Sequence, residues 1–208
     1  MTKKQRAELV LKELKKLYPD TQQFIHADTP WEFLVAVILT AQTTDKKVNE
    51  ITPTLFARYK GVKAYANADI AEFESYIAQI GLYKSKAKYI IHTANMIHKT
   101  FNDTVPKTME ELITLSGVGR KTANVILSEV YGIQEGIIVD THVIRLANKF
   151  KLASGNDAKK IEQALLPIIP KEERHYFSNA LIAYGREHSP ARKKDDDNDI
   201  ISQALLSS

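Results

Sequence analysis

The sequence predicts an all-α protein, and two features of its residue pattern support this fold class. Apolar residues recur with the three- and four-residue spacing of a helix face along most of the chain, while the alternation typical of a strand is almost absent. Residues that prefer helix N-termini stand at the start of these apolar segments. Only residues 136–139 have β-branched character, and because they lead into a helix start we expect an extended connector there.

The first two expected helices are marked by their start and stop residues. One extends from about residue 3 to residue 18, where Pro19 ends it. Its apolar stripe consists of Ala7, Val10, Leu11, Leu14 and Leu17. Thr29, Pro30 and Glu32 then combine an N-cap, a first-turn proline and a capping-box acid. They precede an apolar helix that ends near Thr40, which we place in the core.

Capping residues also mark the middle of the chain. Asp45 is expected to cap a helix that ends near residue 59, and Asp69 caps another that ends near residue 79. Residues 81–83 then form a loop. Thr108 and Glu111 form a capping box for a short helix that ends near residue 115. Further helical patterns cover residues 85–101, 120–131, 141–150, 157–166 and 171–184.

Length and composition limit the domain number and exclude several kinds of site. With 208 residues and 44% hydrophobic content, the chain is long enough for one large domain or two small ones. Lys and Arg outnumber Asp and Glu by 29 to 25, which suits an anionic partner. The absence of cysteine excludes disulfides, thiol nucleophiles, thiolate zinc sites and cysteine-held iron–sulfur clusters. The longest apolar stretch, Phe33 to Leu39, is too short to span a bilayer, so we expect a cytoplasmic protein.

A glycine turn between two expected helices is the most informative motif of the sequence. Gly117, Val118 and Gly119 precede a helix that begins near Arg120, with Lys121 in its first turn. The unpaired N–H groups of such a helix start, together with the helix dipole, attract a phosphate. The spacing matches neither a Walker loop nor a dinucleotide-binding fingerprint. The alternative interpretation is an ordinary helical hairpin in which the glycines only turn the chain.

The C-terminal tail carries a run of charges over residues 191–198, which is typical of a solvated or frayed end. Three aspartates at alternate positions, from Asp195 to Asp199, imitate the start of a calcium loop. However, Ile200 occupies the place of the turn glycine and Leu206 that of the bidentate glutamate. We therefore expect no metal site in this segment.

Four motifs resemble, in the same order, those of endonuclease III, the helix-hairpin-helix DNA glycosylase and abasic-site lyase. They are Ala41–Asp45, Gly81–Ala87, Leu115–Leu127 and Val139–His142. The resemblance implies a six-helix barrel at residues 21–131 that contains the hairpin, a second helical domain formed by residues 1–20 and 132–208, and an active cleft between them. It also implies that the partner is damaged double-stranded DNA, and that the protein is a monomer without membrane association, located at the nucleoid of a prokaryote.

The tail departs from this family, whose members usually end with four cysteines that hold a [4Fe–4S] cluster. An ungapped comparison that starts at Gly185 puts Ser189, Asp196, Asp199 and Leu205 at those four places. We therefore expect a cluster-free variant without a cofactor, whose catalytic residues lie elsewhere in the chain. Our hypothesis is that apolar packing fastens the tail in place of the cluster. The residues concerned are Ile200, Ile201, Leu205 and Leu206.

The resemblance makes Lys121 the nucleophile and Asp140 its partner. An uncharged amine that attacks the sugar C1′ displaces the base and leaves a Schiff base, from which β-elimination expels the 3′ phosphate. The carboxylate can shuttle the proton of the amine or stabilise positive charge at C1′. From the residues alone, Lys121 also fits a solvated helix lysine and Asp140 an N-cap. His142, which we place near phosphate, also fits a structural histidine.

Attack at C1′ requires the nucleotide to leave the base stack, so a side chain must fill the gap. The resemblance implies that Gln42 hydrogen-bonds to the orphaned base and that Leu82 wedges between bases. From the sequence alone Leu82 also fits inward packing. Phosphate contacts are expected from Ser85, Lys86 and Lys88, although lysines on a helix face are usually just solvated. The expected backbone contacts of the hairpin are Gly117, Val118, Gly119 and Arg120.

The leading functional hypothesis is a bifunctional glycosylase for oxidised pyrimidines in duplex DNA, which also nicks abasic sites. A second interpretation is an adenine mismatch glycosylase of the same superfamily. That relative uses a catalytic glutamate near the Gln42 motif and lacks the hairpin lysine, whereas residues 36–41 here contain no acid. A third interpretation is a helix-hairpin-helix module that binds duplex DNA without catalysis.

Overall fold

The structure is a computed structural model that describes residues 1–19, 25–190 and 196–207. Within these ranges every regular element is a helix and no strand is present, which confirms the predicted all-α class. The connector at residues 137–139 pairs its backbone with side chains. The N–H of Ile137 donates to Glu162 Oε1 at 3.2 Å, and the N–H of Ile138 donates to Ser178 Oγ at 3.1 Å. These buried amides are therefore satisfied without a neighbouring strand.

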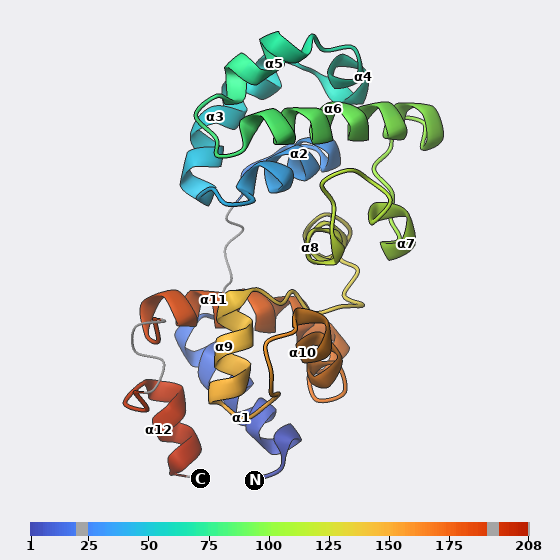
Figure 1. The fold of residues 1–208 in the computed structure, drawn as a ribbon. Coiled ribbons are helices and arrows are strands. Elements are labelled where there is room, and N and C mark those ends of the chain that lie inside the picture. The colour runs from blue at the N-terminus through green and yellow to red at the C-terminus, as the bar shows by residue number, and fades with distance from the viewer. Residues whose placement is uncertain (20–24, 191–195, 208) are drawn as a thin grey trace. The chain divides into compact units, whose positions relative to one another are not determined.

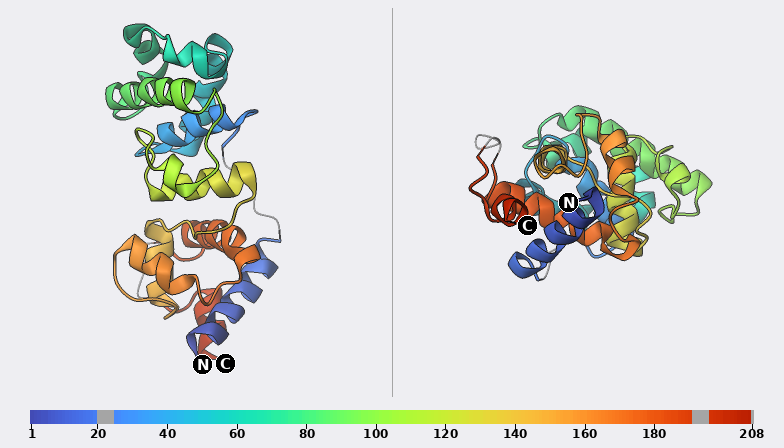
Figure 2. Two further views of the ribbon diagram at one scale, coloured as in Figure 1. Left: turned by 90° about the vertical axis from the view of Figure 1, so that its right-hand side faces the viewer. Right: turned by 90° about the horizontal axis from the view of Figure 1, so that it is seen from below.

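The chain forms two compact units (Figure 1). The central unit is Gln23–Ile133, and the terminal unit is Met1–Gln22 together with Gln134–Ser208. From the sequence, the domain boundaries were expected after residues 20 and 131. Both ends of the chain belong to the terminal unit, where the first helix and the last helix are in contact, as the further views show (Figure 2).

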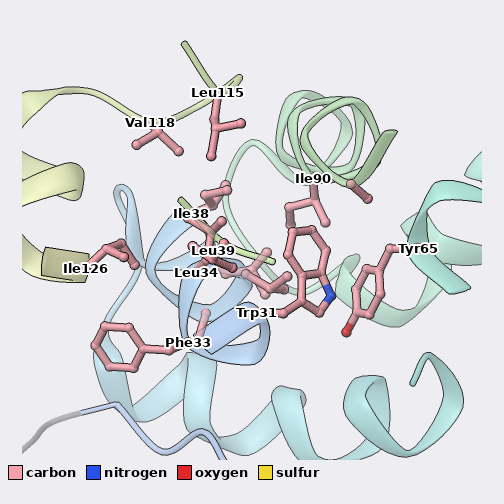
Figure 3. Close-up of a cluster of buried hydrophobic side chains, with 14 of the residues drawn as sticks. Trp31, Phe33, Leu34, Ile38, Leu39, Tyr65, Ile90, Leu115, Val118 and Ile126 are labelled. Carbon is pink, nitrogen blue, oxygen red and sulfur yellow. The ribbon is translucent and has the colours of Figure 1, made fainter. Parts of the chain in front are cut away.

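The central unit is built around one apolar helix, α2 (Pro30–Thr40). The other helices of this unit are α3 (Asp45–Arg58), α4 (Gly61–Ala66), α5 (Ile70–Ile77), α6 (Tyr83–Thr100), α7 (Met109–Leu112) and α8 (Arg120–Tyr131). Helix α2 contacts α3, α4, α6 and α8, so it forms the centre of the core. Figure 3 shows Trp31, Phe33, Leu34, Ile38 and Leu39 of α2 together with residues from α4, α6, the hairpin turn and α8.

The start of α2 follows from local sequence. Thr29 Oγ1 accepts a hydrogen bond from the N–H of Glu32 at 3.2 Å, and the Glu32 carboxylate accepts one from the N–H of Thr29 at 3.1 Å. This is the predicted capping box, and Pro30 stands in the first turn. The helix can be apolar over most of its surface because seven of its residues are buried.

The terminal unit combines the first helix with the last third of the chain. Its helices are α1 (Lys3–Leu17), α9 (Thr141–Lys149), α10 (Ala158–Leu165), the 3-10 helix η1 (Lys171–Glu173), α11 (Arg174–Glu187) and α12 (Ile200–Leu206). Helix α11 contacts α1 and α9, and α12 contacts α1. The core of this unit includes Leu14, Leu146, Phe177 and Tyr184, all of them fully buried.

Two helices were not predicted from the sequence. Helix α4 has six residues, its N-cap Lys60 provides no side-chain hydrogen bond, and only Val62 and Tyr65 are buried, so neither a cap nor a stripe identifies it. Helix α12 follows the charged run 191–198 that was interpreted as a solvated or frayed end, and Asp199 caps the helix by accepting from the N–H of Ser202 at 3.1 Å. Of the charged run, residues 191–195 lie outside the described residues.

The apolar residues of α12 divide into two groups. Ile201 and Leu205 are buried in the core of the terminal unit, whereas Ile200 is 44% exposed and Leu206 is 70% exposed. The hypothesis that all four residues fasten the tail is therefore wrong for Ile200 and Leu206. An amphipathic helix of seven residues has one buried face, and residues four apart share it.

Among the described residues, no helix combines the length and the hydropathy that crossing a bilayer requires.

Candidate functional site

The hairpin turn is held by hydrogen bonds and by close packing against α6. Gly117 has a φ of +77°, and a Cβ at this residue would lie 3.1 Å from Tyr89 Cβ. Only glycine meets both conditions without strain. Thr93 Oγ1 donates to the Ser116 carbonyl at 2.9 Å, and His92 Nδ1 lies 2.7 Å from Ser116 Oγ. The turn is thus positioned by the middle of α6.

The hairpin leaves the first turn of α8 accessible. Gly119 is the N-cap, and no side chain caps the helix. A glycine N-cap has no side chain to cap the helix start, which suits this end of α8 to an anion. Val118 does not point outward, since its side chain is buried and its N–H donates to the Leu115 carbonyl at 3.1 Å. Gly117, Gly119 and Arg120 are exposed.

Lys121 lies in that first turn of α8, and its side chain is exposed. From this position the amine can reach a bound molecule. Burial of Ala123, Ile126 and Leu127 on the opposite side of α8 fixes the helix to the core, so the amine is carried by a rigid element.

Gln42 and Leu82 share an unusual backbone conformation. Their φ angles are +55° and +59°, in the left-handed region that non-glycine residues seldom adopt. Both side chains face outward, and Leu82 is 58% exposed, so the sequence alternative of inward packing for Leu82 is wrong. The two turns are adjacent, because a Cβ at Gly81 would lie 3.4 Å from the Gln42 carbonyl oxygen.

Helix α6 connects these turns with the hairpin. Leu82 is its N-cap, Ser85 and Tyr89 lie on the exposed face, and Tyr89 packs against Gly117. Residues 82, 85, 89 and 92 follow the spacing of one helix face. Leu82 and Ser85 were predicted from the sequence as site residues, whereas Tyr89 and His92 were not. The helical spacing itself is the signal that could have identified them.

Lys86 differs from its neighbours Lys84 and Lys88, which are exposed. The residue is 3% exposed, and its ammonium donates to the Leu39 carbonyl at 2.8 Å and to Thr43 Oγ1 at 3.1 Å. Burial lowers the pKa of Lys86. This location is unsuited to the phosphate contact that the sequence analysis expected, since the charged end is turned away from solvent.

Asp140 and His142 belong to the terminal unit. Asp140 is the N-cap of α9, and its Oδ1 accepts from the N–H groups of His142 at 2.8 Å and Val143 at 2.9 Å. A single carboxylate oxygen takes both bonds, so the other oxygen can face a further partner. The N-cap interpretation of Asp140 is therefore correct, and it leaves the carboxylate chemically usable.

His142 is engaged by Arg145. The Arg145 guanidinium lies 3.3 Å from His142 Nδ1 and donates to the Gly185 carbonyl at 3.3 Å. A Cβ at Gly185 would lie 2.9 Å from His142 Nδ1, so glycine is required there by space. Burial lowers the pKa of Arg145, and the negative charges of Asp140 and Asp199 oppose that shift. Arg145 thus places a positive charge near Asp140 within the same unit.

An iron–sulfur cluster does not fit this chain. The chain has no cysteine to ligate iron, and the four positions that correspond to the family's ligands hold Ser189, Asp196, Asp199 and Leu205. Among the described residues, no group of three His, Asp or Glu side chains is arranged to hold a metal ion. Asp199 is engaged by other groups, since Lys149 lies 2.7 Å from its Oδ2.

Comparison with known proteins agrees with this geometry. The model of the HhH-GPD superfamily of base excision DNA repair proteins matches residues 35–171. Endonuclease III of Synechocystis sp. is 45% identical over 192 residues, which are 92% of this chain and 88% of the relative. The chain belongs to the endonuclease III family. The Escherichia coli endonuclease III is 37% identical over 193 residues, 93% of this chain and 90% of the relative.

Solved structures of the endonuclease III family support the same assignment. A trapped endonuclease III–DNA covalent intermediate matches with a TM-score of 0.87 and 38% identity, over 92% of this chain and 90% of that one. A non-covalent endonuclease III–DNA complex matches with a TM-score of 0.90 and 34% identity over both full chains. The protein is therefore a base-excision repair enzyme with glycosylase and lyase activity that binds DNA, as the sequence motifs predicted.

Proposed function

We propose that the protein removes oxidised pyrimidines from double-stranded DNA and then cuts the strand by β-elimination, with Lys121 as nucleophile and Asp140 as the acid–base partner. It acts as a monomer on the nucleoid of a prokaryote. The observation that carries the proposal is the exposed amine of Lys121 in the uncapped first turn of α8. An anion-binding helix start and a nucleophile then occupy adjacent positions, as attack on a phosphate-flanked sugar requires.

The proposed reaction begins with attack of the Lys121 amine on C1′. The new N–C1′ bond forms while the bond from C1′ to the base breaks, and the base leaves with the electron pair and takes up a proton. The sugar ring opens to a Schiff base. Loss of a C2′ proton then breaks the bond between C3′ and its oxygen, which releases the 3′ phosphate. Water finally hydrolyses the Schiff base and restores the lysine.

Asp140 is proposed to take the proton that the Lys121 ammonium must lose before attack. The same carboxylate can stabilise positive charge at C1′ as the base departs. Two structural features support the assignment. One carboxylate oxygen is fixed by the start of α9, which orients the group, and the guanidinium of Arg145 interacts electrostatically with it.

A nicking assay tests the function directly. Duplexes that carry thymine glycol, a preformed abasic site or an adenine mismatch are compared with undamaged duplex and with single-stranded thymine glycol. We expect base removal and nicking for thymine glycol and nicking for the abasic site, with no action on the mismatch. Adenine removal without nicking would support the adenine mismatch alternative. Binding to all duplexes without any cut would support the non-catalytic module.

Replacement of Leu82 by alanine is expected to slow removal of thymine glycol by about tenfold to a hundredfold. The reason is that an exposed wedge stabilises the unstacked state by about 1–3 kcal/mol. Nicking of a preformed abasic site should change less, since no damaged base has to leave the stack. Ile70→Ala is the matched control, because Ile70 is another exposed apolar residue of the central unit. Equal losses for both variants would contradict a wedge.

A further inference from the structure

Two loops of the central unit are tied together by one residue, Lys86. Its ammonium donates to the Leu39 carbonyl and to Thr43 Oγ1, which lie on either side of Gln42. Its backbone N–H donates to the Leu82 carbonyl at 3.0 Å. The side chain therefore fixes the turn of Gln42 while the backbone fixes the turn of Leu82.

The ammonium of Lys86 occupies the C-terminal end of α2. Leu39 lies in the last turn of that helix, where carbonyl groups lack intrahelical partners and carry partial negative charge. A cation at this end satisfies a carbonyl and interacts favourably with the dipole. Burial of a charge is costly, and neither of the two hydrogen-bond partners is a carboxylate. A neutral apolar side chain would fill the same space without that cost, but it could not hold the turn.

We propose that Lys86 is a positioning residue that holds Gln42 and Leu82 as one unit for insertion into the base stack. The role rests on the proposed function, in which these two side chains fill the gap left by the extruded nucleotide. Both turns require left-handed backbone at a non-glycine residue, which is a strained conformation that surrounding contacts must maintain. Lys86 supplies such contacts to both turns.

The test uses Lys86→Met, which keeps the length of the side chain and removes the charge. We expect removal of thymine glycol to fall about tenfold or more, because a displaced catalytic or binding group is costly even at small shifts. The thermal unfolding midpoint of the variant is measured together with its activity. Thr43→Val provides a milder variant, because it removes one hydrogen bond without changing the buried lysine. Lys99→Met is the matched control, since Lys99 is an exposed lysine of the same helix.

A substitution cycle in the background of Gln42→Ala with Leu82→Ala separates positioning from general destabilisation. If Lys86 acts through Gln42 and Leu82, then Lys86→Met or Thr43→Val should add little to the loss caused by removing both of these side chains. Losses that multiply, or wild-type activity of Lys86→Met, would overturn the proposal. Absence of base removal by the unsubstituted protein would instead contradict the proposed function itself, so the two failures are distinguishable.

A second, independent observation concerns the tail, where three of the four positions that hold cysteines in the family converge on one cation. Lys149 Nζ lies 3.2 Å from Ser189 Oγ, 2.6 Å from the Asp196 carbonyl oxygen and 2.7 Å from Asp199 Oδ2. The side chains of Lys149 and Asp199 are only 5% and 3% exposed. The fourth position, Leu205, packs in the apolar core.

The carboxylate of Asp199 has a complete set of partners. Tyr184 donates its hydroxyl to Oδ1, Ser202 donates its N–H to Oδ1 at 3.1 Å, and Ser202 Oγ donates to Oδ2 at 2.7 Å. Burial opposes ionisation, but the hydrogen bonds from Lys149, Tyr184 and Ser202 outweigh it and hold the pKa of Asp199 below its ordinary value. The Tyr184 hydroxyl also accepts from the N–H of Ile201 at 3.0 Å.

We infer that the Lys149–Asp199 pair is the fastening of the C-terminal segment and occupies the place of the absent cluster. The pair joins the end of α9 to the start of α12, and Tyr184 extends it to α11. A cation at the centre and oxygen ligands around it perform the cross-linking that iron and thiolate sulfur would perform. The fastening therefore depends on neither iron nor the redox state of the medium.

The test compares thermal unfolding midpoints. Lys149→Met leaves a buried carboxylate without its cation, and we expect the midpoint to fall by about 10 °C or more. Asp199→Asn should have a similar effect, and the double variant should lose less than the two single losses combined. Lys15→Met breaks the exposed pair with Glu173 and should change the midpoint by about 2 °C or less.

Two further results decide between fastening by the pair and fastening by apolar packing alone. Should the single variants fail to fold, Ser189→Ala removes one hydrogen bond from Lys149 and should still lower the midpoint more than Lys15→Met does. Unchanged midpoints for Lys149→Met and Asp199→Asn, or strictly additive losses in the double variant, would overturn the inference. Apolar packing by Ile201 and Leu205 would then be the whole fastening.

Discussion

Replacement of Lys121 by alanine is expected to abolish covalent trapping of the protein on abasic DNA by borohydride and to reduce nicking by at least about 10³-fold. Borohydride reduces a Schiff base to a stable amine, so trapping requires the attacking nitrogen to be present. Alanine is the residue most compatible with a helix, so α8 should remain intact. The thermal midpoint is measured to check this.

Binding of the Lys121→Ala variant to abasic duplex should survive, because the exposed amides of the hairpin and Arg120 remain. Lys99→Ala serves as the control, since Lys99 is an exposed lysine near the end of α6. Full trapping by Lys121→Ala would show that another amine carries the reaction. Loss of binding together with loss of trapping would show that Lys121 mainly contacts phosphate.

Replacement of Asp140 by asparagine is expected to slow nicking by about 10²–10⁴-fold, the usual contribution of a general acid or base. Asparagine caps a helix as well as aspartate does, so the hydrogen bonds to His142 and Val143 and the start of α9 should persist. The charge alone is lost. Affinity for abasic duplex should be unchanged or slightly higher, because a carboxylate repels phosphate.

Two companion variants separate the chemical role of Asp140 from its structural role. Asp140→Ala removes both the charge and the cap, so it should add a stability loss of about 1 kcal/mol to the same kinetic defect. Asp157→Asn makes the matched change at the N-cap of α10 and should leave nicking unaffected. A near-wild-type rate for Asp140→Asn would contradict the acid–base role and show that Asp140 acts only as an N-cap.

Helix starts were predictable where a side chain both caps the helix and precedes an apolar segment. Thr29 with Glu32 shows this, because the capping box is local and needs no tertiary contact. Helix α4 shows the opposite case. It packs closely on α6, so tertiary contacts rather than its own six residues stabilise it.

The lysines show that residue type alone does not indicate whether a charged side chain is buried or exposed. Lys86 was grouped with Lys88 as a phosphate contact, although it stands in register with the buried residues Ile90, Thr93 and Ile97 of α6. A basic residue at a core position of a helix is the sequence signal of a buried cation. The partner of Lys86 that follows α2, Thr43, lies about forty residues earlier in the chain. Only the structure identifies those partners.

The tail contains a long-range ion pair that could not be predicted from the sequence. The charges of residues 191–198 predicted a solvated end, yet the residue that follows them, Asp199, is buried against Lys149, which lies fifty residues earlier in the chain. Lys149 follows His142 and Arg145 on one face of α9, and this polar face gave no indication of what covers it. Long-range ion pairs of this kind require the tertiary fold before they can be recognised.

Identification of the trapped residue is the most direct test of covalent catalysis by Lys121. The unsubstituted protein is reduced with borohydride on abasic duplex, the DNA is digested, and the protein is cleaved and analysed by tandem mass spectrometry. The account predicts that the mass of the residual sugar is found on Lys121 and on no other amine. An adduct on the N-terminal amine or on a different lysine, or no adduct at all, would contradict it.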